Sequence, residues 1–393
     1  MERFNFYAPT YFAFGKGQAE QTGELVRRFG GTRALLVYGG GSIKRNGAYD
    51  DVTASLKAAG IPWAELGGIQ PNPRSGKVYE GIELCRREGV DFILPVGGGS
   101  AIDTAKAIAV GVPYDGDFWD FFSKKAPEKT LPVGVVLTIA ATGSESSNAT
   151  VITKEEGNLK WGNVKSDLYR PAFAVMDPAY TCSLPAYQTA CGATDMLSHI
   201  FERYFTNTEH VDVTDRLCEG LMQTILTAAP QAIAHPEDYD ARAELMWAGT
   251  LAHNDTCGVG RVQDWASHQI EHELSAFFDC AHGAGLAVVT PAWMRYVMPH
   301  IYMRFAQFAV RVMGCQMDFA CPENTAREGV DRLEAWLRSI GMPTTLAEIG
   351  ADPAMIPEMA AHRAQKPNGF PFGQFMKIYP EDMEAILRLA VGE

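Results

Sequence analysis

The chain has 393 residues, of which 47% are hydrophobic and 21% are charged, a composition that excludes a disordered or low-complexity protein. At roughly 100 to 200 residues per domain, this length favours two domains. Its 34 Lys and Arg against 47 Asp and Glu give a net charge of −13, which argues against a nucleic-acid-binding or anionic-membrane-binding surface.

The first ~180 residues alternate short apolar runs with helical stretches, a pattern that predicts a parallel sheet covered by helices. The aromatic stretch 4–14 is a candidate edge strand that could pair with a second copy of the chain. Glycine, serine, threonine or proline follows each main strand, and open α/β sheets bind their ligands at such strand ends. The expected strands are Ala34 to Gly39, Phe92 to Val96, Val133 to Ile139 and Ala172 to Asp177.

A glycine cluster, Gly39 to Ser42, follows the first of these strands, and Lys44 and Arg45 come directly after it. In dinucleotide sites an acidic residue at this place holds the ribose of NAD, whereas small and basic residues leave room for a 2′-phosphate. No acid occurs before Asp50. If the cluster belongs to a dinucleotide site, it favours NADP(H) over NAD(H), although basic residues beside a loop are often only solvated.

A second cluster, Gly97 to Ser100, follows the next strand and opens a predicted helix that carries Asp103. Glycines let backbone amides approach a pyrophosphate, and the helix N-terminus adds partial positive charge. Ser100 with Asp103 also fits a helix N-cap. A tight strand-to-helix turn without a ligand explains the same residues, and the pattern is not the GxGxxG fingerprint. Thr138 and the hydroxyl-rich run 142–145 end the third strand and suit hydrogen bonds to a phosphate, ribose or amide.

From about Ser183 apolar residues recur at helical spacing, which predicts an all-helical second half and a boundary near residue 182, with domains 1–182 and 183–393. A cleft between the two domains is the expected site. Pro322 fits the first position of one helix and Gly341 its C-terminal stop. The expected helices include Gln188 to Tyr204, Ala241 to His253, Val262 to Leu274 and Pro322 to Ile340.

Histidines and one acid in this half are spaced as metal ligands can be. Asp195 and His199 are four residues apart on one predicted helix, His268 and His272 share that spacing on another, and His282 begins a third. One carboxylate and two or three imidazoles suit Zn²⁺ or Fe²⁺ with a position open for substrate. Each histidine could equally be a surface or hydrogen-bonded core residue.

The eight cysteines form no CxxC pair, which fits neither a disulfide framework nor a zinc ribbon. Residues 1–10 lack the apolar core of a signal peptide, and no run of about 18 uncharged apolar residues could span a bilayer. We therefore expect a soluble cytoplasmic protein with reduced thiols that binds neither nucleic acid nor membrane.

Together these elements resemble the iron-containing, or group III metal-dependent, alcohol dehydrogenases, and most closely their NADPH-dependent aldehyde reductase and butanol dehydrogenase branch. The matching stretches extend over essentially the whole chain. They are GGGSIKRNG (39–47), QPNPR (70–74), PVGGGSAIDTAKAIA (95–109), ATGSESS (141–147), DPAYTCSLP (177–185), GATDMLSHIFERYF (192–205) and DWASHQIEHELSAFFDCAHGAGLAVVTPAWMRYV (264–297).

The resemblance implies an N-terminal α/β dinucleotide domain and an all-α C-terminal domain, an architecture shared with dehydroquinate synthase. It implies one divalent metal, Fe²⁺ or Zn²⁺, held by Asp195, His199, His268 and His282. His272 matches an extra histidine near substrate and nicotinamide that could assist proton transfer or only shape the pocket. The implied cofactor residues are Gly40, Gly41, Ser42, Asn72, Gly97, Gly98, Gly99, Ser100, Asp103, Thr138, Thr142, Lys160 and Thr181.

The chain departs from many relatives at Ile139, Ala140 and Ala141, so position 139 is given no hydrogen bond to cofactor. The expected activity is hydride transfer between NADP(H) and a small aliphatic aldehyde or primary alcohol, by a homodimer. A lyase of the dehydroquinate-synthase type would need several basic side chains near the metal, and 260–285 offers only Arg261. A catalytically silent nucleotide-binding protein is the other alternative.

Overall fold

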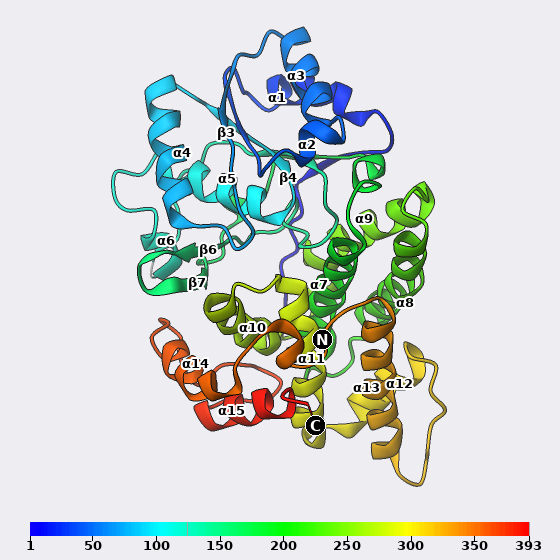
Figure 1. Ribbon diagram of the computed structural model, residues 1–393. Coiled ribbons are helices and arrows are strands. Elements are labelled where there is room, and N and C mark those ends of the chain that lie inside the picture. Colours follow the sequence, from blue (N-terminus) through cyan, green and yellow to red (C-terminus); the bar gives the residue numbers. More distant parts are fainter. Residues whose placement is uncertain (124, 393) are drawn as a thin grey trace. The chain divides into compact units, whose positions relative to one another are not determined.

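The computed structural model describes residues 1–123 and 125–392 and contains two compact units (Figure 1). The N-terminal unit consists of residues 7–185 and 235–254. The helical unit consists of residues 1–6, 186–234 and 255–393. No helix in the described part of the chain is both long and apolar enough to cross a membrane.

A six-stranded, all-parallel sheet forms the centre of the N-terminal unit, in the order β1-β8-β5-β4-β2-β3. A separate antiparallel hairpin, β6-β7, follows β5. The strands are β1 (Tyr11–Phe14), β2 (Ala34–Val37), β3 (Trp63–Leu66), β4 (Phe92–Gly97), β5 (Gly134–Leu137), β6 (Val151–Lys154), β7 (Leu159–Gly162) and β8 (Phe173–Met176).

Alternate residues of the sheet enter two separate apolar cores, one on each face. Leu35, Ile93 and Val135 belong to the core that helices α4 and α5 cover, whereas Leu36 and Leu94 belong to the core that α1 and α3 cover. This two-sided burial explains why the central strands are continuous apolar runs. The helices of this unit are α1 (Thr22–Arg28), α2 (Ser42–Arg45), α3 (Ala48–Ala58), α4 (Ser75–Glu88), α5 (Gly99–Gly111), α6 (Asp120–Ser123) and α9 (Tyr239–His253).

Helix α9 belongs to the N-terminal unit although it lies far along the chain. It packs on the short helix η4 (Pro178–Thr181), and Thr250 donates a hydrogen bond to the buried carboxyl group of Glu145. Gly143 has a φ of +63°, and a Cβ there would lie 2.5 Å from the Cβ of His253. The chain therefore leaves the N-terminal unit after residue 185 and comes back to it for residues 235–254. A single boundary at residue 182, as predicted, does not describe this second segment.

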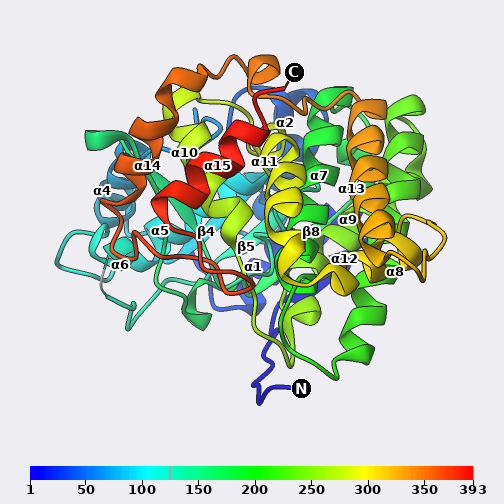
Figure 2. The same ribbon diagram turned by 90° about the horizontal axis from the view of Figure 1, so that it is seen from below.

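The helical unit is arranged around α11, which packs against α7, α10, α13 and α15 (Figure 2). Its helices are α7 (Ala186–Tyr204), α8 (Asp212–Ala234), α10 (Ala266–Phe278), α11 (His282–Val297), α12 (Tyr302–Arg311), α13 (Pro322–Ser339), α14 (Ile356–Arg363) and α15 (Pro380–Leu389).

The predicted elements agree with the structure within a few residues, except at α10, whose two ends each lie four residues later than predicted. That helix was expected from Val262, but it begins at Ala266 because Trp265 has a left-handed backbone conformation, with φ 71° and ψ 12°. At α13 the prediction is confirmed, since Pro322 is the first helical residue and Gly341 follows the last turn with φ 80°. The strands β3, β6 and β7 were not predicted, whereas β1 forms part of the expected edge strand 4–14.

Candidate metal centre and cofactor-binding edge

The predicted cofactor residues gather at one edge of the parallel sheet. From β2 the chain continues to β3 on one side and then to β4 on the other, so the strand order reverses between β2 and β4. Open α/β sheets bind their ligands at this kind of position. Gly40, Gly41 and Ser42 follow β2, while Gly97 to Ser100 end β4 and begin α5. The two glycine clusters therefore lie at the carboxyl ends of neighbouring strands.

Two glycines of the second cluster are also required by protein packing. A Cβ on Gly99 would lie 2.5 Å from Cγ2 of Thr142, and one on Gly98 would lie 3.0 Å from Ile139. The loop after β5 thus rests directly on the start of α5, and Thr138 joins β4 through its amide, 3.0 Å from the Gly97 oxygen. A close approach of cofactor to this turn remains compatible with the same glycines.

Asp103, which stays a predicted cofactor contact, also makes hydrogen bonds within the protein that the sequence did not predict. Its carboxylate accepts hydrogen bonds from Ser144 Oγ (2.6 Å) and from the Val151 amide (2.9 Å), so one oxygen binds the loop after β5 and the other the start of β6. The predicted Ser100–Asp103 N-cap is wrong, because Gly98 is the N-cap of α5 and no side chain caps it. One turn after Asp103, the buried Lys106 donates to the backbone oxygens of Ser147 and Ala149, each at 3.0 Å. The motif GSAIDTAK therefore anchors the loop that carries Thr138 and Thr142.

Asn72 and Lys160 are brought near each other by the β6-β7 hairpin. The amide of Thr153 donates to the Pro73 oxygen at 2.8 Å, and Thr153 is the pairing partner of Lys160 across the hairpin. Asn72 has a φ of 52°, and both it and Lys160 are buried. Thr181 lies in η4 after β8, where its hydroxyl donates to the Pro178 oxygen. These three residues stay predicted cofactor contacts.

The predicted metal ligands come from three helices of the helical unit. Asp195 and His199 lie one turn apart on α7, His268 lies in the first turn of α10, and His282 is the first residue of α11. One ligand atom each from Asp195, His268 and His282 forms a group whose members are all within 4.8 Å of one another. His199 lies beside this group and outside it, with its ring stacked on that of His268 at a centroid distance of 4.7 Å.

The spacing of these atoms suits a divalent ion. Asp195 Oδ1 lies 3.5 Å from His199 Nδ1 and 3.7 Å from Nε2 of both His268 and His282. In a tetrahedral site with bonds of about 2.1 Å, neighbouring ligand atoms are about 3.4 Å apart. His268 Nε2 is buried and makes no hydrogen bond to any described residue. A cation accounts for this donor set, and the residues fit a bound Zn²⁺ or Fe²⁺.

Two buried carboxylates fix the orientation of the imidazoles. His268 Nδ1 lies 2.8 Å from Glu202 Oε1, and His282 Nδ1 is hydrogen-bonded to Glu271 Oε2. Because each Nδ1 faces a carboxylate, each Nε2 would be free to bind an ion, an arrangement typical of metal-binding histidines. Sequence reasoning missed both acids. Their signal is an acid one turn from a predicted ligand, since Glu202 follows His199 by three residues and Glu271 follows His268 by three.

The surroundings of the centre shift the pKa values of His268 and His199 in opposite directions. Burial opposes a charged imidazole at His268, but the negative charges of Asp195 and Glu202, together with the hydrogen bond to Glu202, outweigh it and raise its pKa to about 9. Burial of His199, together with the positive charges of His268 and Arg203, lowers the pKa of His199 well below its ordinary value. A bound cation would compete with the proton on His268, so metal binding should release protons.

His272, the predicted catalytic histidine, lies one turn after His268 on α10 and is half-buried. Its ring centroid is 5.9 Å from that of His282. The indole of Trp265 lies next to the imidazoles of His199 and His268, with ring centroids 5.9 Å and 5.2 Å apart. The predicted metal ligands are therefore flanked by the imidazole of His272 beside His282 and by the indole of Trp265 beside His199 and His268.

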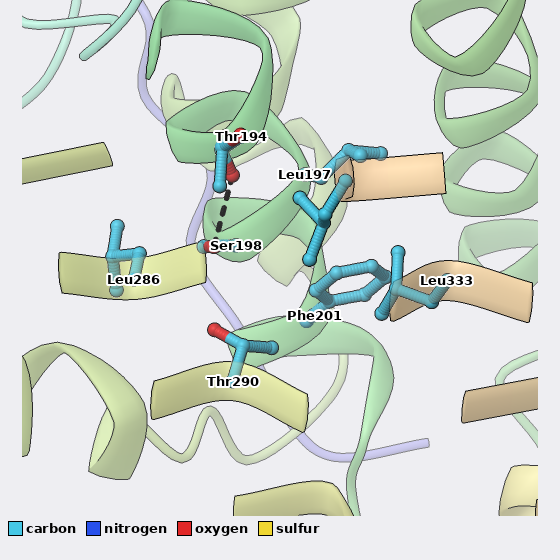
Figure 3. A pocket seen from close by; sticks show the side chains of 8 residues that line it. Thr194, Leu197, Ser198, Phe201, Leu286, Thr290 and Leu333 are labelled. Carbon is cyan, nitrogen blue, oxygen red and sulfur yellow. Dashed lines mark hydrogen bonds between the residues drawn. The ribbon is translucent and has the colours of Figure 1, made fainter. Parts of the chain in front are cut away.

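A small internal cavity lies on another face of α7 and is separate from the metal centre (Figure 3). Thr194 and Ser198, each directly before a predicted ligand, line it, and Ser198 Oγ donates to the Thr194 oxygen at 2.9 Å. The cavity has an otherwise largely apolar lining and no titratable side chain. Its lining residues are Thr194, Leu197, Ser198, Phe201, Leu286, Thr290, Leu333 and Leu337.

Replacing Glu202 with glutamine should lower the affinity for Zn²⁺ by about 10-fold to 100-fold, because an amide holds the His268 tautomer less well than a carboxylate. Competition with a chromophoric chelator measures this affinity. Glu273→Gln is the matched control. Glu273 lies on α10 and is buried like Glu202, but it pairs with His362 and Lys366 instead of a predicted metal ligand. Equal affinities in wild type and Glu202→Gln would contradict the assignment.

Comparisons with known proteins identify relatives over the whole length of the chain. Residues 9–178 match the model of the iron-containing alcohol dehydrogenases, and residues 189–391 match the C-terminal model of that family. The chain is 44% identical to the probable NADH-dependent butanol dehydrogenase 2 of Bacillus subtilis over the full length of both. It is 37% identical to the NADPH-dependent aldehyde reductase YqhD of Escherichia coli, covering 91% of this chain and 92% of that protein.

Among solved structures, NADH-dependent butanol dehydrogenase A of Thermotoga maritima superposes with a TM-score of 0.96 at 41% identity, covering 100% of this chain and 99% of the other. This similarity extends over both units and confirms the predicted combination of an α/β domain with a helical domain. The chain belongs to the iron-containing alcohol dehydrogenase family.

Proposed function

We propose that this dehydrogenase transfers hydride between NADP(H) and a small aliphatic aldehyde or primary alcohol, with one divalent metal, Fe²⁺ or Zn²⁺. The observation that carries the proposal is the group formed by Asp195, His268 and His282, whose two imidazoles are held by Glu202 and Glu271. An ion bound there would act as a Lewis acid on the carbonyl oxygen of the substrate. Reduced nicotinamide would supply the hydride.

Residues of the chain supply the negative charge at the metal site, orient the imidazoles and provide the proton for the alcohol. Asp195 contributes the negative charge of the ligand set, and the outer carboxylates keep Nε2 of His268 and His282 directed at one point. His272 is half-buried beside His282, so it can exchange protons with solvent, and we assign it the proton that completes the alcohol. The substrate needs little recognition beyond its oxygen, in agreement with a small apolar aldehyde.

The geometry counts against a dehydroquinate-synthase-like lyase. Such an enzyme needs basic side chains that bind an anionic substrate at the metal. Arg261, the one candidate in that part of the sequence, is buried, pairs with Asp215 at 2.7 Å and donates to the backbone oxygens of Arg203 and Val211. The intact ligand group argues likewise against a silent nucleotide-binding protein.

The preference for NADP(H) is supported by the surroundings of Ser42. Ser42, Lys44 and Arg45 are exposed on α2, next to the turn proposed for the adenosine ribose. The nearest acid on the neighbouring strand is Glu65, and its carboxylate accepts hydrogen bonds from Tyr38 (2.8 Å), Tyr49 (2.7 Å) and Trp63 (3.2 Å). These protein groups occupy the carboxylate that could otherwise bind a ribose, while Ser42, Lys44 and Arg45 remain exposed at the turn.

The names of the relatives divide between the two cofactors, since the Bacillus and Thermotoga proteins are named NADH-dependent and the Escherichia protein NADPH-dependent. The proposal on cofactor choice therefore rests on the residues of this chain.

We further propose that the enzyme works as a cytoplasmic homodimer joined at β1. This strand is one edge of the sheet, and the aromatic residues along and before it are exposed, including Phe6 at 50% and Tyr7 at 57%. A second copy is the occupant that would cover such an edge. The eight free cysteines agree with a reducing compartment.

Removing the metal should abolish the reduction of butanal, and adding back Fe²⁺ or Zn²⁺ should restore it. The measurement is the loss of NADPH absorbance with chelator-treated enzyme that is given each ion separately. His268→Ala should lose both bound metal and activity, while NADPH binding followed by fluorescence stays unchanged because the predicted nucleotide contacts lie in the other unit. Full activity in His268→Ala would refute the metal assignment.

Ser42→Asp should weaken NADPH binding by about tenfold, which corresponds to ~1.4 kcal/mol, while NADH binding changes little. A carboxylate at this turn repels the 2′-phosphate that only NADPH carries. Fluorescence titration of each nucleotide gives both dissociation constants. Ser339→Asp, an exposed position on α13, is the control for the added charge. Wild-type enzyme that binds NADH as tightly as NADPH would overturn this part of the proposal.

The Tyr7→Asp, Tyr11→Asp double variant should be a monomer, because two carboxylates at the exposed edge oppose its pairing with a second copy. Light scattering at micromolar concentration should give twice the chain mass for wild type and one chain mass for the variant. Phe319→Asp, at a residue 88% exposed in another loop, should remain dimeric. A monomeric wild type would disprove the dimer.

A further inference from the structure

Trp265 has an unusual backbone for a bulky residue. Its φ of 71° and ψ of 12° place it in the left-handed region, which large side chains rarely adopt and which tends to mark functional sites. The preceding residue holds it there. Asp264 is buried, and its Oδ1 accepts hydrogen bonds from the amides of Gln374 and Phe375, the latter at 2.7 Å, while Oδ2 accepts one from Ala266.

This conformation directs the indole at two of the predicted metal ligands. The indole plane makes angles of 62° and 68° with the imidazoles of His199 and His268, at centroid distances of 5.9 and 5.2 Å. Perpendicular contacts of this kind are a favoured aromatic geometry. Indole Nε1 donates to Gln263 Oε1 at 3.1 Å, which fixes the ring about its own axis.

A buried arginine supports the indole. Cζ of Arg203 lies 4.7 Å from the ring centroid, and Arg203 Nη1 donates to the backbone oxygen of His199 at 2.7 Å. Arg203 is 1% exposed and Trp265 is half-buried, so the guanidinium is shielded from water and its cation–π attraction to the indole is strengthened. The indole is thus held by Arg203, by Gln263 and by its own backbone, and it contacts both histidines.

We propose that Trp265 is a positioning residue, which sets the ring planes of His199 and His268 and keeps water away from that side of the bound metal. The inference rests on the metal centre of the proposed function. The rings of Trp265, His199 and His268 contact one another in pairs, because the His199 ring also stacks on that of His268 at a centroid distance of 4.7 Å.

The test measures Co²⁺ binding, since this ion reports its ligand geometry through visible absorption bands. Trp265→Ala should bind Co²⁺ about tenfold or more weakly than wild type, in the range known for residues that orient metal ligands, and its bands should shift. Trp265→Phe keeps an aromatic ring and should recover most of the affinity and the wild-type spectrum. Thermal unfolding of the metal-free proteins shows whether each variant is folded.

Two further variants separate positioning from general destabilisation. Trp265→Gly removes both the indole and the backbone strain, so the metal-free protein should unfold at a higher temperature than Trp265→Ala and still bind Co²⁺ weakly. Trp336→Ala removes a half-buried tryptophan of α13 whose indole donates to the Leu226 oxygen. It should lower thermal stability and leave Co²⁺ affinity and spectrum unchanged.

Wild-type affinity and spectrum in Trp265→Ala would overturn the inference, as would an equal loss in Trp336→Ala. The outcome is distinguishable from failure of the proposed reaction. Wild-type protein that binds Co²⁺ but does not reduce aldehydes with any ion would refute the reaction while the Trp265 result stands by itself.

Discussion

The crowding of imidazole nitrogens around one buried carboxylate oxygen, Oδ1 of Asp195, is the constraint on which the helical unit depends. Three histidine nitrogens lie within 3.7 Å of this atom, and two further buried acids, Glu202 and Glu271, stand directly behind the rings. Three carboxylates in a low-dielectric interior are unfavourable without compensating positive charge. Protonated histidine provides part of that charge, and a divalent ion provides it without competing for the Nδ1 hydrogen bonds. A bound cation would compensate the negative charge of these buried carboxylates.

In the N-terminal unit the main constraint is the close approach of backbone segments at the carboxyl ends of the strands. Gly98 and Gly99 bring the start of α5 against Ile139 and Thr142, and hydrogen bonds from the following loop to Asp103 and from the buried Lys106 to that loop then hold it in place. The same absence of side chains that permits this packing leaves backbone amides accessible at a helix N-terminus. The same glycines can therefore serve both the packing of α5 and the binding of a ligand.

Much of this arrangement could be predicted from the sequence. The four predicted strands form consecutive members of the sheet, β2, β4, β5 and β8, because strands buried on both faces read as continuous apolar runs. The spacing of Asp195 with His199 places both on one face of α7, as helical periodicity requires. The strand β3, Trp63–Leu66, was missed because it is half-buried and contains Glu65.

What could not be predicted depends on contacts between distant segments. The role of Asp103 follows from its bonds to Ser144 and Val151, more than forty residues away, and no local pattern reveals them. The start of α10 was misplaced because residues 262–265 have helical spacing of apolar groups, whereas bonds from residues 374 and 375 to Asp264 favour another backbone. Long-range contacts of this kind override local propensity.

The return of α9 to the N-terminal unit determines how the chain can be divided. The polypeptide passes between the two units four times, after residues 6, 185, 234 and 254, so neither unit is a continuous stretch of sequence. A fragment ending at residue 182 would lack the helix that covers η4 and would leave the buried carboxyl group of Glu145 without Thr250. Gene fusions, truncations and domain exchanges in this chain must therefore carry residues 235–254 along with the sheet.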